Sequence, residues 1–187
     1  MNDKVPNRSF AGSKETRIAW AITGAGHTLA DCANCLLRYP NVDIFLSRAA
    51  EEVIRIYALQ DRLRVPGVRI YRETLASAPL VVRLFRGTYS VLVVAPATSN
   101  SVAKFVHGIS DTLVTNLFAQ AGKARVPIIV MPTDLAPEMD SVGPHGEPVK
   151  VYPRPIDLEN TARLRKFPGV TVVESIEEME RCLATYL

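Results

Sequence analysis

Short apolar runs that alternate with segments of helical spacing constrain the fold of this chain more than any other feature of its sequence. The strongest run is Val91 to Ala95, which is apolar at every position, and Ile128 to Met131 repeats that character. A strand that is apolar on both faces is normally central in a parallel sheet, because helices must then cover each side. Four further runs complete the predicted sheet: Arg17 to Thr23, Val42 to Leu46, Val68 to Tyr71 and Val170 to Val173.

Apolar residues at helical spacing follow most of these strands. The predicted helices are Leu29 to Leu36, Ala49 to Ile56, Pro79 to Phe85, Val102 to Val106, Leu113 to Ala121 and Ile176 to Tyr186. Ser47 is expected to cap the second helix, and Ser110 or Asp111 the fifth. Strands that alternate with helices throughout predict a doubly wound α/β fold, with a mostly parallel sheet flanked by helices and right-handed crossovers.

The length of 187 residues suits one domain, which we assign to residues 17 to 187. Residues 1 to 16 are polar and have no apolar signal core, so we expect them to form a tail. Hydrophobic residues make up 48% of the chain and charged residues 22%, as in ordinary folded proteins. This composition gives no support to a collagen-like, coiled-coil or disordered chain.

Charge, hydropathy and cysteine usage exclude further classes. The net charge of +3 is scattered and only 7% of residues are aromatic, which disfavours nucleic acid as a partner. No apolar run approaches the roughly 18 to 20 residues that span a membrane. The three cysteines do not form a disulfide framework, so we expect them to be reduced and the protein to be cytoplasmic.

Residues 132 to 157 are the exception to the alternation of strands and helices. This segment has prolines at positions 132, 137, 144, 148, 153 and 155 and shows neither strand nor helix spacing. We therefore predict a long proline-rich loop. Because it begins where a central strand ends, where open α/β sheets bind ligands, it is interpreted as a substrate lid or an oligomer arm rather than a linker.

A glycine turn leaves the first predicted strand and opens the first helix. Its residues are Gly24, Ala25, Gly26 and His27. Unpaired backbone N–H groups and the positive end of the helix dipole favour a phosphate at such a turn. The dinucleotide fingerprint would need a glycine in place of Leu29 and an acidic residue in place of Ser47. NAD is therefore disfavoured and a mononucleotide favoured, and Arg48, which would suit the 2′-phosphate of NADP, is interpreted as a surface residue.

A second turn, rich in hydroxyl and amide groups, leaves the strongest strand. It consists of Pro96, Ala97, Thr98, Ser99, Asn100 and Ser101. Such groups bind phosphate, ribose or the edge of a ring, but Ser99 or Asn100 would also suit the N-cap of the next helix. The residues alone leave both interpretations open.

The same turn, with the residues that follow it, resembles a family signature. The chain reads Pro96-Ala97-Thr98-Ser99-Asn100-Ser101, then Ala103-Lys104, then Gly108, Asp111, Leu113 and Asn116. This order resembles the FMN-binding signature (PASANT, AK, GxxDxLxxN) of the homo-oligomeric flavin-containing cysteine decarboxylase superfamily. Within it, Ile22 to His27 resembles the archaeal flavoprotein branch that includes the dihydromethanopterin reductases. The resemblance covers residues 17 to 135 and the last strand and helix.

The resemblance implies a bound FMN and an oligomer. The FMN phosphate is expected near Gly24, Ala25, Gly26 and His27, with a further contact from Ser47 and with Pro96, Ala97, Thr98, Ser99 and Asn100 against the flavin. In the superfamily the flavin lies at subunit contacts, so a homo-oligomer is implied, either a trimer or an assembly of trimers.

Two departures from the signature argue against decarboxylation of a cysteine substrate. The cysteine decarboxylases have a histidine after the third strand, and Arg72 to Arg83 contains none. Their substrate clamp (PxMNxxMW) should follow the fifth strand, where this chain has Pro132 to Met139. Carboxylates at Asp134 and Glu138 would instead suit the amino-pyrimidine edge of a pterin, although they would also suit an exposed loop.

The sequence therefore predicts an FMN-dependent oxidoreductase that acts on the CH–NH group of a pterin, like the dihydromethanopterin reductases. Candidate proton donors are Asp134, Glu138, His145 and Tyr152. An external ferredoxin-like protein is the expected electron donor, since a basic chain would attract an acidic carrier. A non-enzymatic FMN electron-transfer protein, an FMN-dependent decarboxylase and a flavin prenyltransferase remain alternatives.

Cys32 and Cys35 form a CxxC pair without a second pair or a matching histidine, so no metal site is expected. We interpret both as small buried apolar residues, with a redox dithiol as the alternative. His27 is interpreted either as a phosphate or flavin contact or as a simple helix start.

Overall fold

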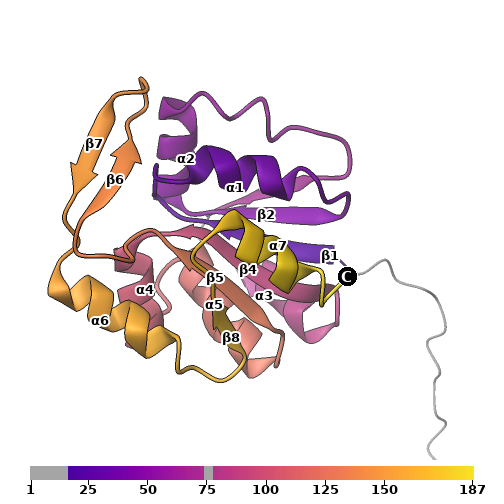
Figure 1. Cartoon of the computed structure of the whole chain (residues 1–187). Coiled ribbons are helices and arrows are strands. Elements are labelled where there is room, and N and C mark those ends of the chain that lie inside the picture. Colours follow the sequence, from indigo (N-terminus) through magenta and orange to yellow (C-terminus); the bar gives the residue numbers. More distant parts are fainter. Residues whose placement is uncertain (1–16, 74–77) are drawn as a thin grey trace, which may run out of the picture.

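The computed structural model describes residues 17–73 and 78–187 and has a parallel sheet of six strands at its centre (Figure 1). These strands are β1 (Arg17–Ile22), β2 (Val42–Leu46), β3 (Arg69–Arg72), β4 (Tyr89–Ala97), β5 (Ile128–Pro132) and β8 (Val170–Val172). Their order is β3-β2-β1-β4-β5-β8, and every neighbouring pair is parallel. The predicted α/β fold is confirmed, whereas the predicted tail, residues 1–16, lies outside the described residues.

Helices cover both faces of the sheet. They are α1 (Leu29–Leu36), α2 (Arg48–Ile56), α3 (Ala78–Phe85), α4 (Ser99–Val106), α5 (Leu113–Lys123), α6 (Pro155–Leu164) and α7 (Ile176–Leu183). Buried residues of α1, α2 and α7 pack on one face, and those of α3, α4, α5 and α6 pack on the other. The strand order reverses between β1 and β4, which is the position where open α/β sheets bind ligands.

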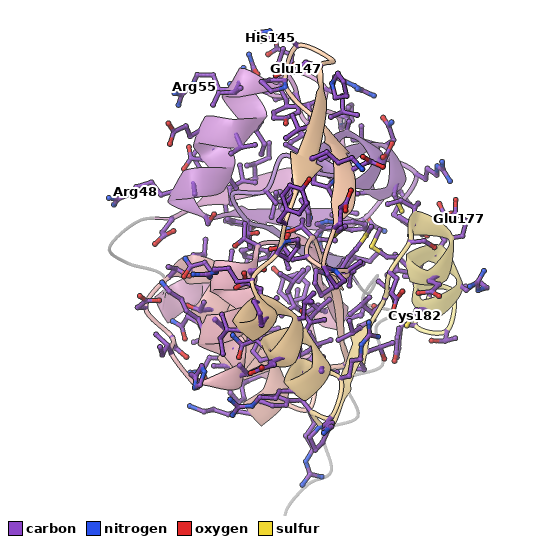
Figure 2. All side chains as sticks on the ribbon, turned by 60° about the vertical axis from the view of Figure 1, so that its left-hand side comes forward. Arg48, Arg55, His145, Glu147, Glu177 and Cys182 are labelled. Atoms are coloured by element: carbon purple, nitrogen blue, oxygen red, sulfur yellow. The ribbon has the colours of Figure 1, made fainter. Side chains whose placement is uncertain are left out.

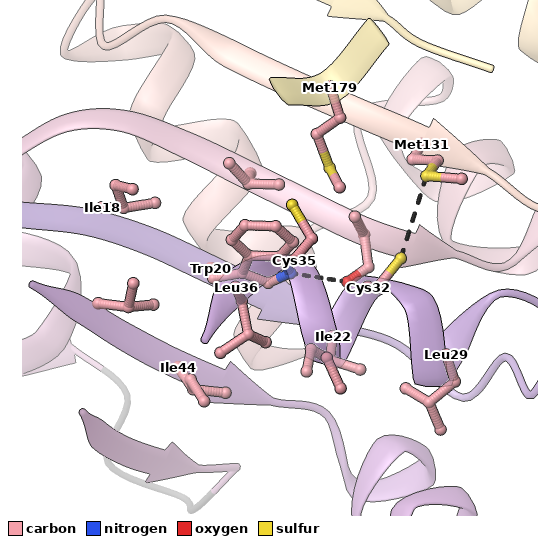
Figure 3. Packing of buried hydrophobic residues seen from close by; sticks show 14 of the residues in the cluster. Ile18, Trp20, Ile22, Leu29, Cys32, Cys35, Leu36, Ile44, Met131 and Met179 are labelled. Carbon is pink, nitrogen blue, oxygen red and sulfur yellow. Dashed lines mark hydrogen bonds between the residues drawn. The ribbon is translucent and has the colours of Figure 1, made fainter. Parts of the chain in front are cut away.

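Successive side chains of β1 point alternately into the two layers of the core. Ile18, Trp20 and Ile22 face the layer of α1, α2 and α7, while Ala19 and Ala21 face the opposite layer. Trp20 is fully buried, and its Nε1 donates a hydrogen bond of 2.8 Å to the backbone oxygen of Ala95 on β4 (Figure 3). The centre of the sheet is therefore fixed by both apolar packing and a specific polar contact.

The prediction of a structureless loop over residues 132 to 157 is wrong. Strands β6 (Met139–Val142) and β7 (Pro148–Val151) form an antiparallel hairpin, and α6 begins at Pro155. The prolines mark the borders of these elements rather than their absence: one is the first residue of β7, and another opens α6, where a missing N–H group costs nothing. The hairpin forms its own two-stranded sheet and projects beside α2 in Figure 1.

Three helix starts show how well capping can be predicted from sequence. The Ser47 hydroxyl accepts a hydrogen bond from the backbone of Ala50, as predicted for α2. Helix α5 is capped by Thr112, so the expected cap at residue 110 or 111 is wrong. Helix α4 is capped by Thr98, so neither Ser99 nor Asn100 has the capping role that the sequence left open for them. Thr112 forms a capping box with Thr115, and that second contact favours it over its neighbours.

None of the helices in residues 17–73 and 78–187 is long and apolar enough to cross a membrane.

Candidate functional site

The carboxyl ends of β1 and β4 are joined at the switch point by Thr23. Its side-chain hydroxyl donates to the backbone oxygen of Pro96, 2.9 Å away, and accepts a hydrogen bond from the backbone N–H of Thr98 at 2.8 Å. The backbone N–H of Thr23 also donates to the Pro96 oxygen. The two turns that the sequence singled out are thus held side by side by one buried residue.

The glycine turn after β1 presents backbone donors at this position. Within the described part of the chain, no protein group accepts a hydrogen bond from the backbone N–H of Gly26, His27 or Thr28. Thr28 adopts a left-handed conformation, with a φ of 58°, before α1 begins. Successive backbone N–H groups in a turn conformation form a concave anion site. The turn therefore has the donors that a phosphate needs.

Both glycines of this turn permit close approach of a neighbour. A Cβ atom on Gly24 would lie 2.6 Å from the Cβ of Ala49 in α2. A Cβ atom on Gly26 would lie 2.3 Å from the hydroxyl oxygen of Tyr57. Any side chain at either position would therefore push α2 or Tyr57 away from the turn.

The turn after β4 contributes polar side chains to the same end of the sheet. Thr98 caps α4, and the Ser99 hydroxyl donates to the carboxylate of Asp134, which follows β5. Thr133, which follows β5, is hydrogen-bonded to the end of β4, because its backbone N–H donates to the Ala97 oxygen at 3.0 Å. Pro96 and Ala97 are buried and present only backbone, while Asn100 is exposed.

These segments enclose a cavity of about 260 Å³. Its lining comes from the glycine turn, the end of α2, the turns after β4 and β5, and the hairpin: Ala25, Gly26, His27, Tyr57, Thr98, Ser99, Thr133, Asp134, Met139, Ser141 and Val151. A second hollow, of about 340 Å³, shares Gly26, His27, Tyr57 and Ser141 with the first. The hairpin therefore forms one wall of the site.

Two polar contacts join the hairpin to this site. The Nδ1 atom of His27 lies 3.0 Å from the Ser141 hydroxyl oxygen, and the Tyr57 hydroxyl donates to the backbone oxygen of Val142 at 3.2 Å. His27 was predicted as a site residue and lines both hollows. Its side chain faces the hairpin as well as the cavity.

Several predicted residues lie elsewhere. Glu138 is exposed and forms an ion pair of 2.7 Å with Lys150 across the hairpin. His145 lies at the exposed hairpin tip, near Glu147 in Figure 2. Tyr152, after β7, has 67% of its surface exposed. Of the four candidate proton donors, only Asp134 lines the cavity.

Ser47 and Asn100 are two further residues that were predicted to contact FMN. The Ser47 hydroxyl is engaged as the cap of α2, and neither residue lines the cavity. Sequence reasoning missed Thr23, Tyr57 and Thr133. Thr23 and Thr133 carry a recognisable signal, because each is a hydroxyl residue at the end of a buried strand, but Tyr57 reaches the site only through the packing of α2.

Cys32 and Cys35 lie on the buried face of α1, as predicted. Burial raises the pKa of each thiol to about 12, and the nearby Glu180 carboxylate adds to the effect at Cys35. The Cys32 sulfur lies 4.0 Å from the sulfur of Met131 (Figure 3). In the part of the chain that the structure describes, no group of three or more metal-binding side chains comes together.

An α/β fold whose glycine turn presents backbone donors at the switch point is typical of nucleotide-binding proteins. The model of the Flavoprotein family matches residues 7–186, and the chain belongs to this family. The family resemblance that the turn after β4 suggested is confirmed.

Three proteins of known sequence or structure are similar to this chain. A crystal structure of DmrB from Burkholderia xenovorans in complex with FMN, described as a cubic protein cage for redox transfer, is 42% identical with a TM-score of 0.83; the match covers 93% of this chain and 96% of that one. An uncharacterized protein of Methanocaldococcus jannaschii is 36% identical over 91% of this chain and 96% of its own length. Dihydromethanopterin reductase (acceptor) of Methanosarcina mazei is 44% identical over 69% of this chain, which spans only 59% of that relative.

Proposed function

We propose that the protein is an FMN-dependent oxidoreductase that reduces a C=N bond of a dihydropterin-type substrate to a CH–NH group. The observation that carries this proposal is the convergence of the glycine turn and the turn after β4 at the switch point of a Flavoprotein-family fold. The FMN complex of the 42% identical DmrB and the name of the Methanosarcina mazei relative support the cofactor and the reaction.

The residues present fit an FMN. The amides of Gly26, His27 and Thr28 would bind the phosphate, because they have no acceptor among the described residues. The Pro96 to Ser99 backbone would lie against the flavin ring. Once bound and reduced, FMN supplies a hydride, while the protein orients the ring and excludes water.

Asp134 is the residue that we assign to the pterin. Its carboxylate faces the cavity and is held there by the Ser99 hydroxyl. A pterin presents adjacent N–H donors on its amino-pyrimidine edge, and a carboxylate accepts such a pair in a bidentate arrangement. Met139 and Val151 would supply the apolar wall beside the ring. Glu138 belongs to the hairpin surface in this arrangement.

An external, acidic electron carrier of the ferredoxin type is the proposed donor. Arg55, Arg64 and Arg72 line a hollow of about 290 Å³ beside α2 and β3, together with the apolar residues Leu46, Ile54, Leu63 and Ile70. Glu51, which also lines it, pairs with Arg72, and Asp61 pairs with Arg64. Figure 2 shows Arg48 and Arg55 on the outer side of α2. The arginines around this hollow outnumber the carboxylates that pair with them, and the remaining positive charge favours a transient partner of negative charge.

The proposed oligomeric state is a homo-oligomer, either a trimer or an assembly of trimers. The similarity to DmrB, which is described as a cubic protein cage, supports it.

We place the reaction in the cytoplasm, because the cysteines at positions 32, 35 and 182 are unbonded, as in a reducing compartment.

An anaerobic absorbance titration tests the function. The FMN-loaded protein is reduced chemically, freed of excess reductant and mixed with dihydromethanopterin or a close dihydropterin, and flavin reoxidation is followed. Rapid reoxidation, faster than that of free reduced FMN at the same concentration, supports the reductase. A flavin that stays reduced with pterins but is reoxidised by a redox protein would assign an electron-transfer role instead, and failure to bind FMN would overturn the cofactor.

A further inference from the structure

Tyr57 contacts both the glycine turn and the hairpin, which lie far apart in the sequence. It is the C-cap residue of α2, and its backbone N–H donates to the Val53 oxygen. The next residue, Ala58, has a φ of 52°, and Leu59 then turns back into the core, where it is buried. The abrupt end of α2 therefore fixes the Tyr57 ring at the edge of the core, half-buried and facing the site.

The ring rests directly on Gly26. The space that a Cβ atom of residue 26 would fill lies 2.3 Å from the Tyr57 hydroxyl oxygen and 2.7 Å from the ring carbon that bears it. From this position the hydroxyl donates to the Val142 oxygen on the hairpin. One side chain thus contacts the predicted phosphate turn on one side and the hairpin on the other.

The hairpin has little else to hold it in place. It forms a two-stranded sheet of four residue pairs, and a hairpin of this size is marginally stable by itself in water. Most of its residues are exposed, and only Met139, Ser141 and Val151 turn a half-buried face toward the cavity. The Leu135 N–H donates to the Met139 sulfur near the start of the hairpin. The contacts toward the glycine turn are the Tyr57–Val142 hydrogen bond and the His27–Ser141 pair.

We propose that Tyr57 is a positioning residue that clamps the β6–β7 hairpin over the site, so that Met139, Ser141 and Val151 form the substrate-binding wall. This inference rests on the proposed function only for the identity of the substrate. The clamp is the hydrogen bond from the Tyr57 hydroxyl to the Val142 oxygen, and the packing of the ring on Gly26 orients this hydroxyl. The His27–Ser141 contact is a second clamp. The hairpin is thereby assigned to the site of its own chain.

The test compares Tyr57→Phe, which keeps the ring and removes the hydroxyl, with Tyr186→Phe as a matched control, since the Tyr186 hydroxyl has no partner among the described residues. Hydrogen exchange of residues 139 to 151 is measured in the FMN-loaded protein by mass spectrometry, together with KM and kcat for the dihydropterin. Loss of one hydrogen bond should speed hairpin exchange about three- to tenfold in Tyr57→Phe. KM should rise by a similar factor with kcat nearly constant.

Ser141→Ala, which removes the second clamp, should add to the effect of Tyr57→Phe on exchange in the double variant. Unchanged exchange in Tyr57→Phe would overturn the clamp, and faster exchange with an unchanged KM would overturn the hairpin's role as the substrate wall. If even the unaltered protein does not turn over pterins, the proposed function fails, while the exchange rates still decide whether Tyr57 holds the hairpin.

Discussion

The two walls of the site are built in different ways. One wall consists of the ends of β1 and β4, which lie in the middle of the sheet and are joined by the three hydrogen bonds of Thr23. The other is the β6–β7 hairpin, which is mostly exposed and is tied by one polar contact to His27 of the glycine turn and by another to Tyr57 at the end of α2. The wall at the ends of β1 and β4 is rigid because it continues the core, whereas the hairpin wall keeps its position only through these few contacts.

The largest difference between the core and the hairpin should be in how fast cysteines at the two places are alkylated. Burial raises the pKa of Cys32 from 9.0 to about 12, so at pH 8 its thiolate fraction is about a thousandfold lower than that of an ordinary thiol. In the native protein Cys32 and Cys35 should therefore resist iodoacetamide, while a cysteine placed on the hairpin by Val142→Cys should react rapidly. Peptide mass spectrometry measures both, and rapid native labelling of Cys32 or Cys35 would revive the redox-dithiol interpretation.

Substitutions in the core and on the hairpin should also differ in their effect on the free energy of unfolding. Trp20→Ala removes a fully buried ring and the hydrogen bond to Ala95, and should lower the free energy of unfolding by about 3–5 kcal/mol. Val142→Ala on the hairpin, where 59% of the residue's surface is exposed, should change it by less than about 0.5 kcal/mol. Urea denaturation of both variants gives the two values, and similar losses would contradict the contrast between the walls.

FMN affinity should depend on the rigid wall. Thr23→Val keeps the shape of the residue but removes the hydroxyl that joins the two turns, leaving the Thr98 N–H without its partner. We expect FMN to bind about tenfold more weakly, as measured by fluorescence quenching of the free flavin. Thr23→Ser restores the hydroxyl and serves as the control, so an equal loss in both variants would point to packing rather than to the hydrogen bonds.

Substrate affinity should depend on Asp134, at the boundary between the walls. Asp134→Asn replaces one acceptor oxygen with a donor and should weaken dihydropterin binding about fivefold while FMN stays bound. Pterin affinity equal to that of the unaltered protein would remove this assignment.

The smallest effect should come from Glu138, which pairs with Lys150 on the exposed surface of the hairpin. Exposed ion pairs contribute little because water and salt screen them. Glu138→Gln should change pterin affinity less than twofold and stability by less than about 0.5 kcal/mol. A loss as large as that of Asp134→Asn would show that the hairpin closes further onto the substrate, with Glu138 brought into the site.

The parallel sheet and the end of it that carries the candidate site could be predicted because their signals are local. The run from Val91 to Ala95 is apolar on both faces, so it had to be a central strand, and the glycine turn follows directly from the first strand. The hairpin and α6 could not be found in this way. The two hairpin strands have four residues each and are half or fully exposed, so the apolar alternation that marks a buried strand is missing.

By itself, the sequence determined the α/β sheet, the two turns at its switch point and the family to which the chain belongs, because each depends on short-range patterning that the backbone follows directly. The tertiary structure decided which residues meet at those turns. Tyr57 lies on Gly26, and Asp134 reaches Ser99 while Glu138 does not, because the end of α2 and the path of the hairpin are set by packing between segments distant in sequence.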